Sequence, residues 1–209
     1  MATKKATEKE IAIELNMKTI RIPIVGKTPL IVHRFSEKAG KQLKEIAEAE
    51  KGLKQGGKKK NIADPQEDYL SSLYFFPDGK RTGFPAGAFK DAMVIAAYRL
   101  FNRPQTVMRT AFFVNADNKE TNLVEIKGEH KMREDMVRVG GIQKVASPRY
   151  RACYPEWSAE LEIEFMTDIL SEEDIVKLVA AAGNSCGIGE WRPEKCNSGD
   201  FGRFCVANQ

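Results

Sequence analysis

A glycine-bracketed loop near the carboxyl end of the sequence, residues 187–204, contains the residue types best suited to contact a polyanion. Its four glycines are Gly187, Gly189, Gly199 and Gly202. Glycines let backbone amides approach a ligand closely. The cations Arg192, Lys195 and Arg203 are candidates to meet phosphates, and Trp191 is a candidate to stack on a base. The alternative is a tight structural loop with Trp191 packed in the core.

A second candidate segment, residues 83–93, is expected to be a loop that enters a helix. The unpaired amides of a helix N-terminus form an anion site, and Lys90 follows one turn inside. The alternative is an ordinary helix started by Pro85, with Phe89 and Met93 in the core. Neither segment matches the Walker A loop or the dinucleotide-binding glycine motif.

Charge is distributed unevenly along the chain. Residues 131–151 contain six basic and two acidic residues, and residues 156–174 contain eight acidic and no basic ones. The cations of the first segment are Lys131, Arg133, Arg138, Lys144, Arg149 and Arg151. Smaller clusters occur at 58–60 and at Arg99, Arg103 and Arg109. We expect a one-sided basic surface, whereas the alternative is ordinary solvated surface.

His33 is the one candidate for acid–base chemistry that the pattern suggests, because a histidine can exchange a proton near pH 7. It lies at the predicted end of the first strand, where packing or capping would explain it equally well. No Ser-His-Asp or Cys-His set can be assembled from the spacing. The four cysteines include no C-x-x-C pair. A zinc site from Cys186, Cys196, Cys205 and a distant histidine stays open, but we expect no metal and no cofactor.

Hydrophobic periodicity predicts the elements that must position these residues. The expected strands are Thr19–Val25, Tyr74–Phe76, Val107–Val114, Leu123–Ile126, Trp157–Phe165 and Phe201–Val206. The expected helices are Ser36–Lys54, Pro65–Leu73 after an Asp64 cap, Ala86–Phe101, and one that begins at a Ser171–Asp174 capping box and ends at Gly183. Residues 128–150 show no clean period and are interpreted as a basic insertion or a long hairpin.

The order of these elements predicts the fold class. The chain begins strand, helix and ends strand, helix, strand, without repeated βαβ units. That order favours an α+β, ferredoxin-like antiparallel sheet with helices on one face and long insertions. We expect a single domain over residues 18–206 and a flexible tail over 1–17.

Composition excludes several function classes. The 209 residues are 42% hydrophobic and carry 33 basic against 29 acidic residues, for a net charge of +4. This is not the composition of a disordered chain. No run of 18 apolar residues predicts a membrane span, and Met1–Glu10 lacks the apolar segment of a signal peptide. We therefore expect a cytoplasmic protein.

The 83–93 and 187–204 segments together resemble the RAMP superfamily, the ferredoxin-like RNA-binding subunits of CRISPR effector complexes. That family pairs a helix start of the type found at Phe84–Ala92 with a C-terminal glycine-rich loop. The chain also resembles an uncharacterised bacteriophage protein family through Met132–Val139 and Gly189–Glu194. The resemblance implies a nucleic-acid-binding fold and subunits that line up head-to-tail along a bound strand. Some family members cleave RNA with a histidine located where His33 lies.

Three functions are consistent with these features. The leading hypothesis is a non-enzymatic protein that binds single-stranded DNA or RNA in phage replication, recombination or counter-defence. It would assemble as a head-to-tail homo-oligomer without contacting a membrane. The second hypothesis is an RNA endonuclease that uses His33, and the third is a protein-interaction module that mimics a CRISPR subunit. The glutamates of 160–164 repel phosphate, so a strand should follow the glycine-rich loop, the 83–93 helix start and the 131–151 insertion.

Overall fold

A four-stranded antiparallel sheet forms the centre of the molecule. In the computed structural model, residues 15–34, 64–139, 145–196 and 198–207 are described. The sheet contains β1 (Met17–Gly26), β5 (Phe112–Asn115), β9 (Ser158–Met166) and β10 (Phe204–Val206). Their order in the sheet is β10-β1-β9-β5, and every neighbouring pair is antiparallel. Numbered along the chain, this is the 4-1-3-2 order of the ferredoxin-like fold, so the predicted fold class is confirmed.

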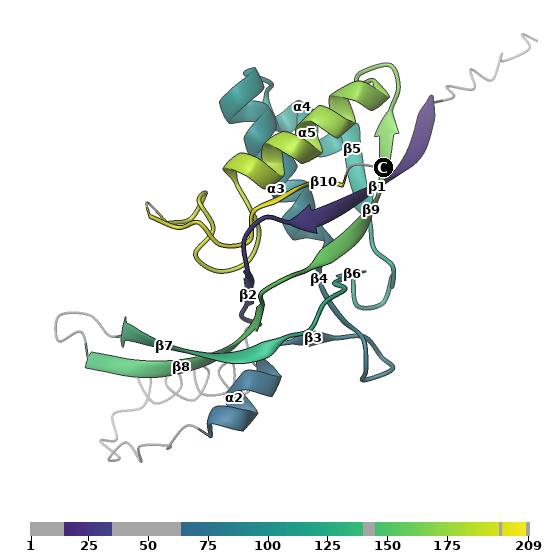
Figure 1. Ribbon diagram of the computed structural model, residues 1–209. Coiled ribbons are helices and arrows are strands. Elements are labelled where there is room, and N and C mark those ends of the chain that lie inside the picture. Colours follow the sequence, from purple (N-terminus) through teal and green to yellow (C-terminus); the bar gives the residue numbers. More distant parts are fainter. Residues whose placement is uncertain (1–14, 35–63, 140–144, 197, 208–209) are drawn as a thin grey trace, which may run out of the picture.

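Two helices, α3 (Ala86–Phe101) and α5 (Glu172–Ser185), pack side by side against one face of this sheet (Figure 1). Alternate residues of the two central strands point into that interface, among them Ile22, Ile24, Leu161 and Ile163. The same core cluster continues through both helices. The predicted capping box of α5 is present, since Ser171 and Asp174 bond reciprocally.

The other face of the sheet is open. Register places Arg21 opposite Glu162, and Glu160 and Glu164 extend from the same face of β9. Arg21 forms an ion pair with Glu162 at 2.8 Å. This face is therefore acidic in its middle, with exposed Phe113 at its β5 edge.

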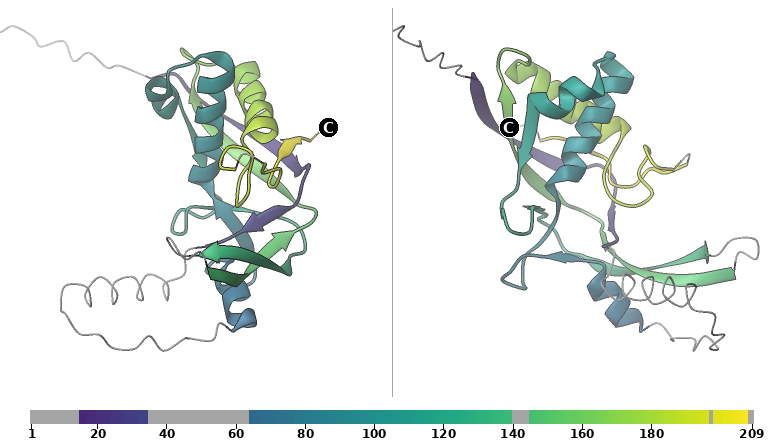
Figure 2. Two further views of the ribbon diagram at one scale, coloured as in Figure 1. Left: turned by 90° about the vertical axis from the view of Figure 1, so that its left-hand side faces the viewer. Right: turned by 180° about the vertical axis from the view of Figure 1, so that it is seen from behind.

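Two small sheets lie beyond the end of the central sheet, and one of them contains a long hairpin (Figures 1 and 2). The hairpin, β7 (Lys131–Val139) and β8 (Val145–Tyr154), pairs with β2 (Leu30–Val32). The second small sheet contains β3 (Tyr74–Phe75), β4 (Thr82–Pro85) and β6 (Leu123–Glu125). The short helix α2 (Pro65–Ser71), capped by Asp64, packs against β8. The hairpin interpretation of the basic segment is thus correct, and its strands extend to Tyr154.

Three of the predicted boundaries are wrong. The final strand, β10, begins at Phe204 rather than at Phe201. Residues 105–111 form the helix α4 (Gln105–Ala111) after Pro104, and only residues from Phe112 onward are strand. Met108 and Ala111, three residues apart, are the buried positions of α4, as expected of a helix rather than a strand. The helix α5 continues through Gly183, where a Cβ atom would overlap the carbonyl oxygen of Phe204. Gly183 therefore allows β10 to approach α5, and the helix ends at Cys186, before Gly187.

Several predictions fall on other parts of the chain. The Ser36–Lys54 helix, the 58–60 cluster, Lys144 and most of the N-terminal tail lie outside the described residues, and β1 begins at Met17. Within the described ranges, no helix has the length and apolar character needed to span a membrane.

Candidate functional site

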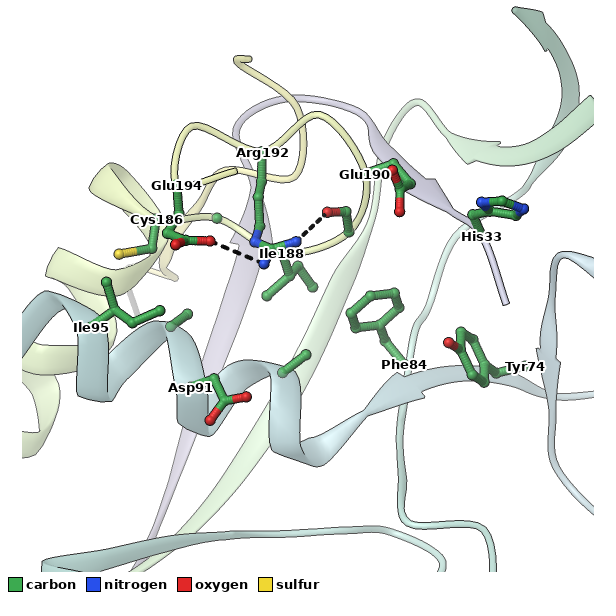
Figure 3. A pocket seen from close by; sticks show the side chains of 14 residues that line it. His33, Tyr74, Phe84, Asp91, Ile95, Cys186, Ile188, Glu190, Arg192 and Glu194 are labelled. Atoms are coloured by element: carbon green, nitrogen blue, oxygen red, sulfur yellow. Dashed lines mark hydrogen bonds and ion pairs between the residues drawn. The ribbon is translucent and has the colours of Figure 1, made fainter. Parts of the chain in front are cut away.

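Three segments that the sequence singled out separately meet at one pocket of about 200 Å³ (Figure 3). His33 follows β2, and Phe84 of β4 and Ala88 of α3 come from the predicted helix start. Gly187–Glu194 belong to the glycine-rich loop. Tyr74 of β3 completes the wall beside His33. The full lining is His33, Tyr74, Phe84, Ala88, Asp91, Ala92, Ile95, Cys186, Gly187, Ile188, Gly189, Glu190, Arg192 and Glu194.

The loop adopts its course because glycines occupy positions that other residues resist. Gly187, Gly189 and Gly202 have φ values of 67°, 79° and 66°, in the left-handed region that favours glycine. Backbone hydrogen bonds then tie the loop to itself and to β2. The Ile188 amide donates to Gly202 O at 3.0 Å, and the Glu190 amide donates to Ile31 O at 2.9 Å. The predicted loop is therefore an ordered element that carries Arg192 to the pocket.

The three predicted loop cations are all engaged with neighbours. Arg192 donates to Gly189 O and to the Glu194 carboxylate, each at 3.0 Å. Lys195 donates to Glu190 at 3.2 Å. Arg203 donates to the carbonyl and side-chain oxygens of Asn184 and to Asp200. In this arrangement the cations hold the loop in shape and fasten it to the end of α5.

The predicted basic insertion presents one cationic face. The β7–β8 register places Lys131 opposite Cys153, Arg133 opposite Arg151, and Asp135 opposite Arg149. Because facing residues of paired strands point the same way, the four cations Lys131, Arg133, Arg149 and Arg151 share this face with a single carboxylate. The side chains of Lys131 and Arg149 make no hydrogen bond or ion pair with any described residue. We call this surface the cationic hairpin face.

Arg133 joins the cationic hairpin face to the loop. Its guanidinium carbon lies 5.4 Å from the ring centroid of Trp191 and 4.9 Å from that of Phe201, within the range of cation–π attraction. The two rings meet edge to face at 5.9 Å. Trp191 is half-buried at this junction rather than in the main core. The two strongest sequence features are thus parts of one surface.

Asp135 is a buried carboxylate within the hairpin. It accepts from Arg133 Nε at 2.9 Å and lies 3.7 Å from the Arg151 guanidinium. The Asp135 and Arg151 side chains are 6% and 8% exposed. The contact between them is electrostatic, because Asp135 Oδ2 and the Arg151 Nε and Nη1 atoms form no hydrogen bond. The ion pair therefore depends on both charges being present.

His33 faces charges from both sides of the site. Partial burial, followed by the positive charge of Arg151, lowers the pKa of His33, and Glu190 acts in the opposite direction. His33 makes no hydrogen bond with any residue that the structure describes. Burial also raises the pKa of Tyr74 across the pocket. At pH 7 the pocket therefore contains a neutral imidazole and a neutral phenol.

The structure does not bring every predicted site residue to this location. Lys90 points to the β5 edge, where its ammonium lies 4.0 Å from the ring centroid of Phe113, and burial lowers the pKa of Lys90. The Lys131 end of the cationic hairpin face lines a separate hollow with Glu129 and Glu156. The backbone of Arg138 lies in β7, but its side chain is outside the described part of the chain.

Sequence reasoning missed several residues of the site. Phe201 lies beside Gly202, so its place in the loop could have suggested a second aromatic contact. Tyr74 and Asp135 carried no such signal, because their roles come from β3 and β7 pairing with distant segments. The three cysteines of the zinc alternative are dispersed: Cys186 lines the pocket, Cys196 borders Trp191, and Cys205 lies in β10.

Comparison with known proteins finds similarity among solved structures. No protein-family model and no curated protein sequence matches the chain. Among solved structures, the crystal structure of Cmr6 from Pyrococcus furiosus is similar with a TM-score of 0.41 and 10% sequence identity. The similarity covers 92% of this chain and 98% of that chain. The α+β fold class rests on the sheet topology described above.

Proposed function

We propose that this protein binds single-stranded nucleic acid without cutting it, as a RAMP-like protein of the cytoplasm. The observation that carries the proposal is the contact of Arg133 with Trp191 and Phe201. It joins a face with four cations to a pair of aromatic rings, the combination with which proteins hold a single strand. Lys131 and Arg149, which lack partners among the described residues, are the phosphate ligands we favour.

The open face of the sheet does not suit a strand. Single-strand-binding sheets use aromatic and basic residues on such a face, whereas Glu160, Glu162 and Glu164 extend from this one. The acidic face instead fits the cationic hairpin face of a second copy, in a head-to-tail homo-oligomer. The proposal includes that the protein acts in phage replication, recombination or counter-defence.

Fluorescence anisotropy with labelled single- and double-stranded DNA and RNA, each at two salt concentrations, tests the proposal. We expect binding to single strands, with affinity that falls steeply as salt rises. For single strands each phosphate contact contributes about 0.7 to the slope of log affinity against log salt. Lys131→Ala combined with Arg149→Ala should therefore flatten the slope by about 1.4. Lys177→Ala on α5 is the matched control, and an equal effect there would contradict the assignment.

A metal-independent RNA endonuclease is the second candidate. It is favoured by the lowered pKa of His33, which leaves the ring able to accept a proton at pH 7. Labelled RNA that stays intact with wild-type protein supports binding alone. Cleavage that disappears in His33→Ala would favour the nuclease, since a general acid or base contributes about 10²–10⁴-fold. Absence of any binding would favour a protein-interaction module.

A further inference from the structure

The pocket between His33 and the glycine-rich loop has more hydrogen-bond acceptors than donors. Three carboxylates line it, from Asp91, Glu190 and Glu194. The one guanidinium in the lining, that of Arg192, already donates to Gly189 O and to Glu194 (Figure 3). Among the described residues, no other cation lines the pocket.

Two of the carboxylates retain capacity to accept. Asp91 makes no hydrogen bond or ion pair with a described residue. Glu190 gives one oxygen to Lys195 at 3.2 Å, which leaves its second oxygen for a ligand. The neutral His33 ring offers one donor and one acceptor. A phosphate or carboxylate would be repelled here, so the pocket does not suit the backbone of a strand.

The walls fit a flat ring. Tyr74 and Phe84 stand edge to face with centroids 5.8 Å apart, and Ala88, Ala92 and Ile188 add small apolar surface. The volume of about 200 Å³ is below the roughly 300–1,000 Å³ of clefts that hold drug-sized ligands. A single aromatic ring system with donor groups on its edge would fit this volume, pack against the apolar walls and donate to the excess acceptors.

We propose that this pocket holds one unstacked base of the bound strand and selects guanine. The inference rests on the proposed function, because it requires a strand. Guanine presents adjacent N1–H and N2–H groups, which one carboxylate can accept together. Adenine and cytosine present an amino group beside an acceptor nitrogen. Thymine and uracil present one N–H between two carbonyl oxygens. Those oxygens would face the carboxylates, and they would lose their hydrogen bonds to water without gaining a donor in the pocket.

Decathymidylate with a single central guanine, adenine or cytosine tests the selectivity by anisotropy at fixed salt. A single substitution is sufficient, because the strand can shift until that base reaches the pocket. We expect the guanine strand to bind about tenfold more tightly than decathymidylate, within the range for a bidentate base contact. Adenine and cytosine should fall between them.

Asp91→Asn and Glu190→Gln, tested separately, should each reduce the guanine preference, measured as the ratio of the affinities for the guanine strand and for decathymidylate. Glu160→Gln on the open sheet face is the matched control and should retain the preference. Equal affinity for all four strands overturns the base pocket but leaves strand binding in place. A preference that survives both pocket variants overturns the location. No binding to any strand overturns the proposed function itself.

Discussion

The protonation state of His33 links the site to solution pH. Burial lowers the pKa of this imidazole most, followed by the positive charges of Arg151, Arg149 and Lys195, whereas the negative charge of Glu190 raises it. Burial lowers the pKa of His130 as well. Both side chains therefore have a lower pKa in the folded protein than in the unfolded chain, where the pKa of a histidine is about 6.5.

The first prediction concerns stability between pH 7.5 and pH 5.5. Below about pH 6.5 the unfolded chain binds more protons at the two histidines than the folded protein does, so the free energy of unfolding should fall as pH falls. Urea denaturation at the two pH values measures this change. His33→Gln should reduce the pH dependence, and an unchanged pH dependence would contradict the effect assigned to His33. Carboxylate titration lies mainly below this window.

A pair of glycine substitutions tests the loop geometry. Gly202 has a φ of 66°, and a Cβ atom there would overlap the Ile188 carbonyl oxygen. Gly202→Ala should therefore lower the free energy of unfolding by at least about 2 kcal/mol. Gly87 lies in the first turn of α3 with open space around it. Gly87→Ala should be neutral or stabilise by up to about 1 kcal/mol. Thermal denaturation of both variants measures the two changes in stability, and equal changes would contradict the effect assigned to Gly202.

At the scale of elements, the hairpin depends on the buried pair of Asp135 and Arg151. Removing one partner leaves the other charge buried without compensation, which costs about 3–5 kcal/mol. Asp135→Leu should lower the free energy of unfolding by about that amount, as measured by urea denaturation. Combining it with Arg151→Leu should recover part of the loss, because no charge then remains buried. Glu134→Leu, at an exposed neighbouring position, is the control, and a double variant less stable than the single one would contradict the pairing.

Local signals in the sequence predicted elements well where the chemistry was itself local. The helix Ala86–Phe101 matched residue for residue, and the Ser171–Asp174 capping box is present. The predicted strand over 107–111 failed because a two-turn segment shows too few positions to distinguish a helical from a strand period. Gly183 was interpreted as a helix end, yet its role comes from contact with Phe204, twenty-one residues later. Such a contact leaves no trace in local spacing.

The candidate site was predicted in parts but not as a whole. Composition identified the glycine-rich loop and the basic insertion, because glycine and cation density are visible in the sequence. It could not show that Arg133 reaches Trp191, since strand pairing sets that approach. Nor could it separate cations held by carboxylates, such as Arg192, from those without partners among the described residues, such as Arg149. Which charges face solvent is determined by tertiary packing.

At the scale of the whole molecule, two surfaces of opposite charge belong to different elements. The open sheet face carries Glu160, Glu162 and Glu164 along one strand, at intervals of about 6.6 Å. The cationic hairpin face lies on β7 and β8, in a separate sheet. A contact between two different patches is heterologous, and its repetition produces a ring or an open filament rather than a closed dimer. Complementary charge would fix the register of such an assembly and accelerate its formation.

The last prediction is that the protein assembles head-to-tail when a long single strand is present. Light scattering should show a mass that grows with strand length. Glu160→Lys with Glu164→Lys makes the sheet face basic, and Lys131→Glu with Arg149→Glu makes the hairpin acidic. In the absence of a strand, each double variant alone should therefore remain unassembled. Mixed together, the two variants should assemble in alternation, because each hairpin then meets a sheet face of opposite charge. Since the acidic hairpin also weakens strand binding, the mixing experiment is repeated at high protein concentration without a strand. A monomer under every condition, or a two-fold dimer whose mass never grows with strand length, would contradict the assembly.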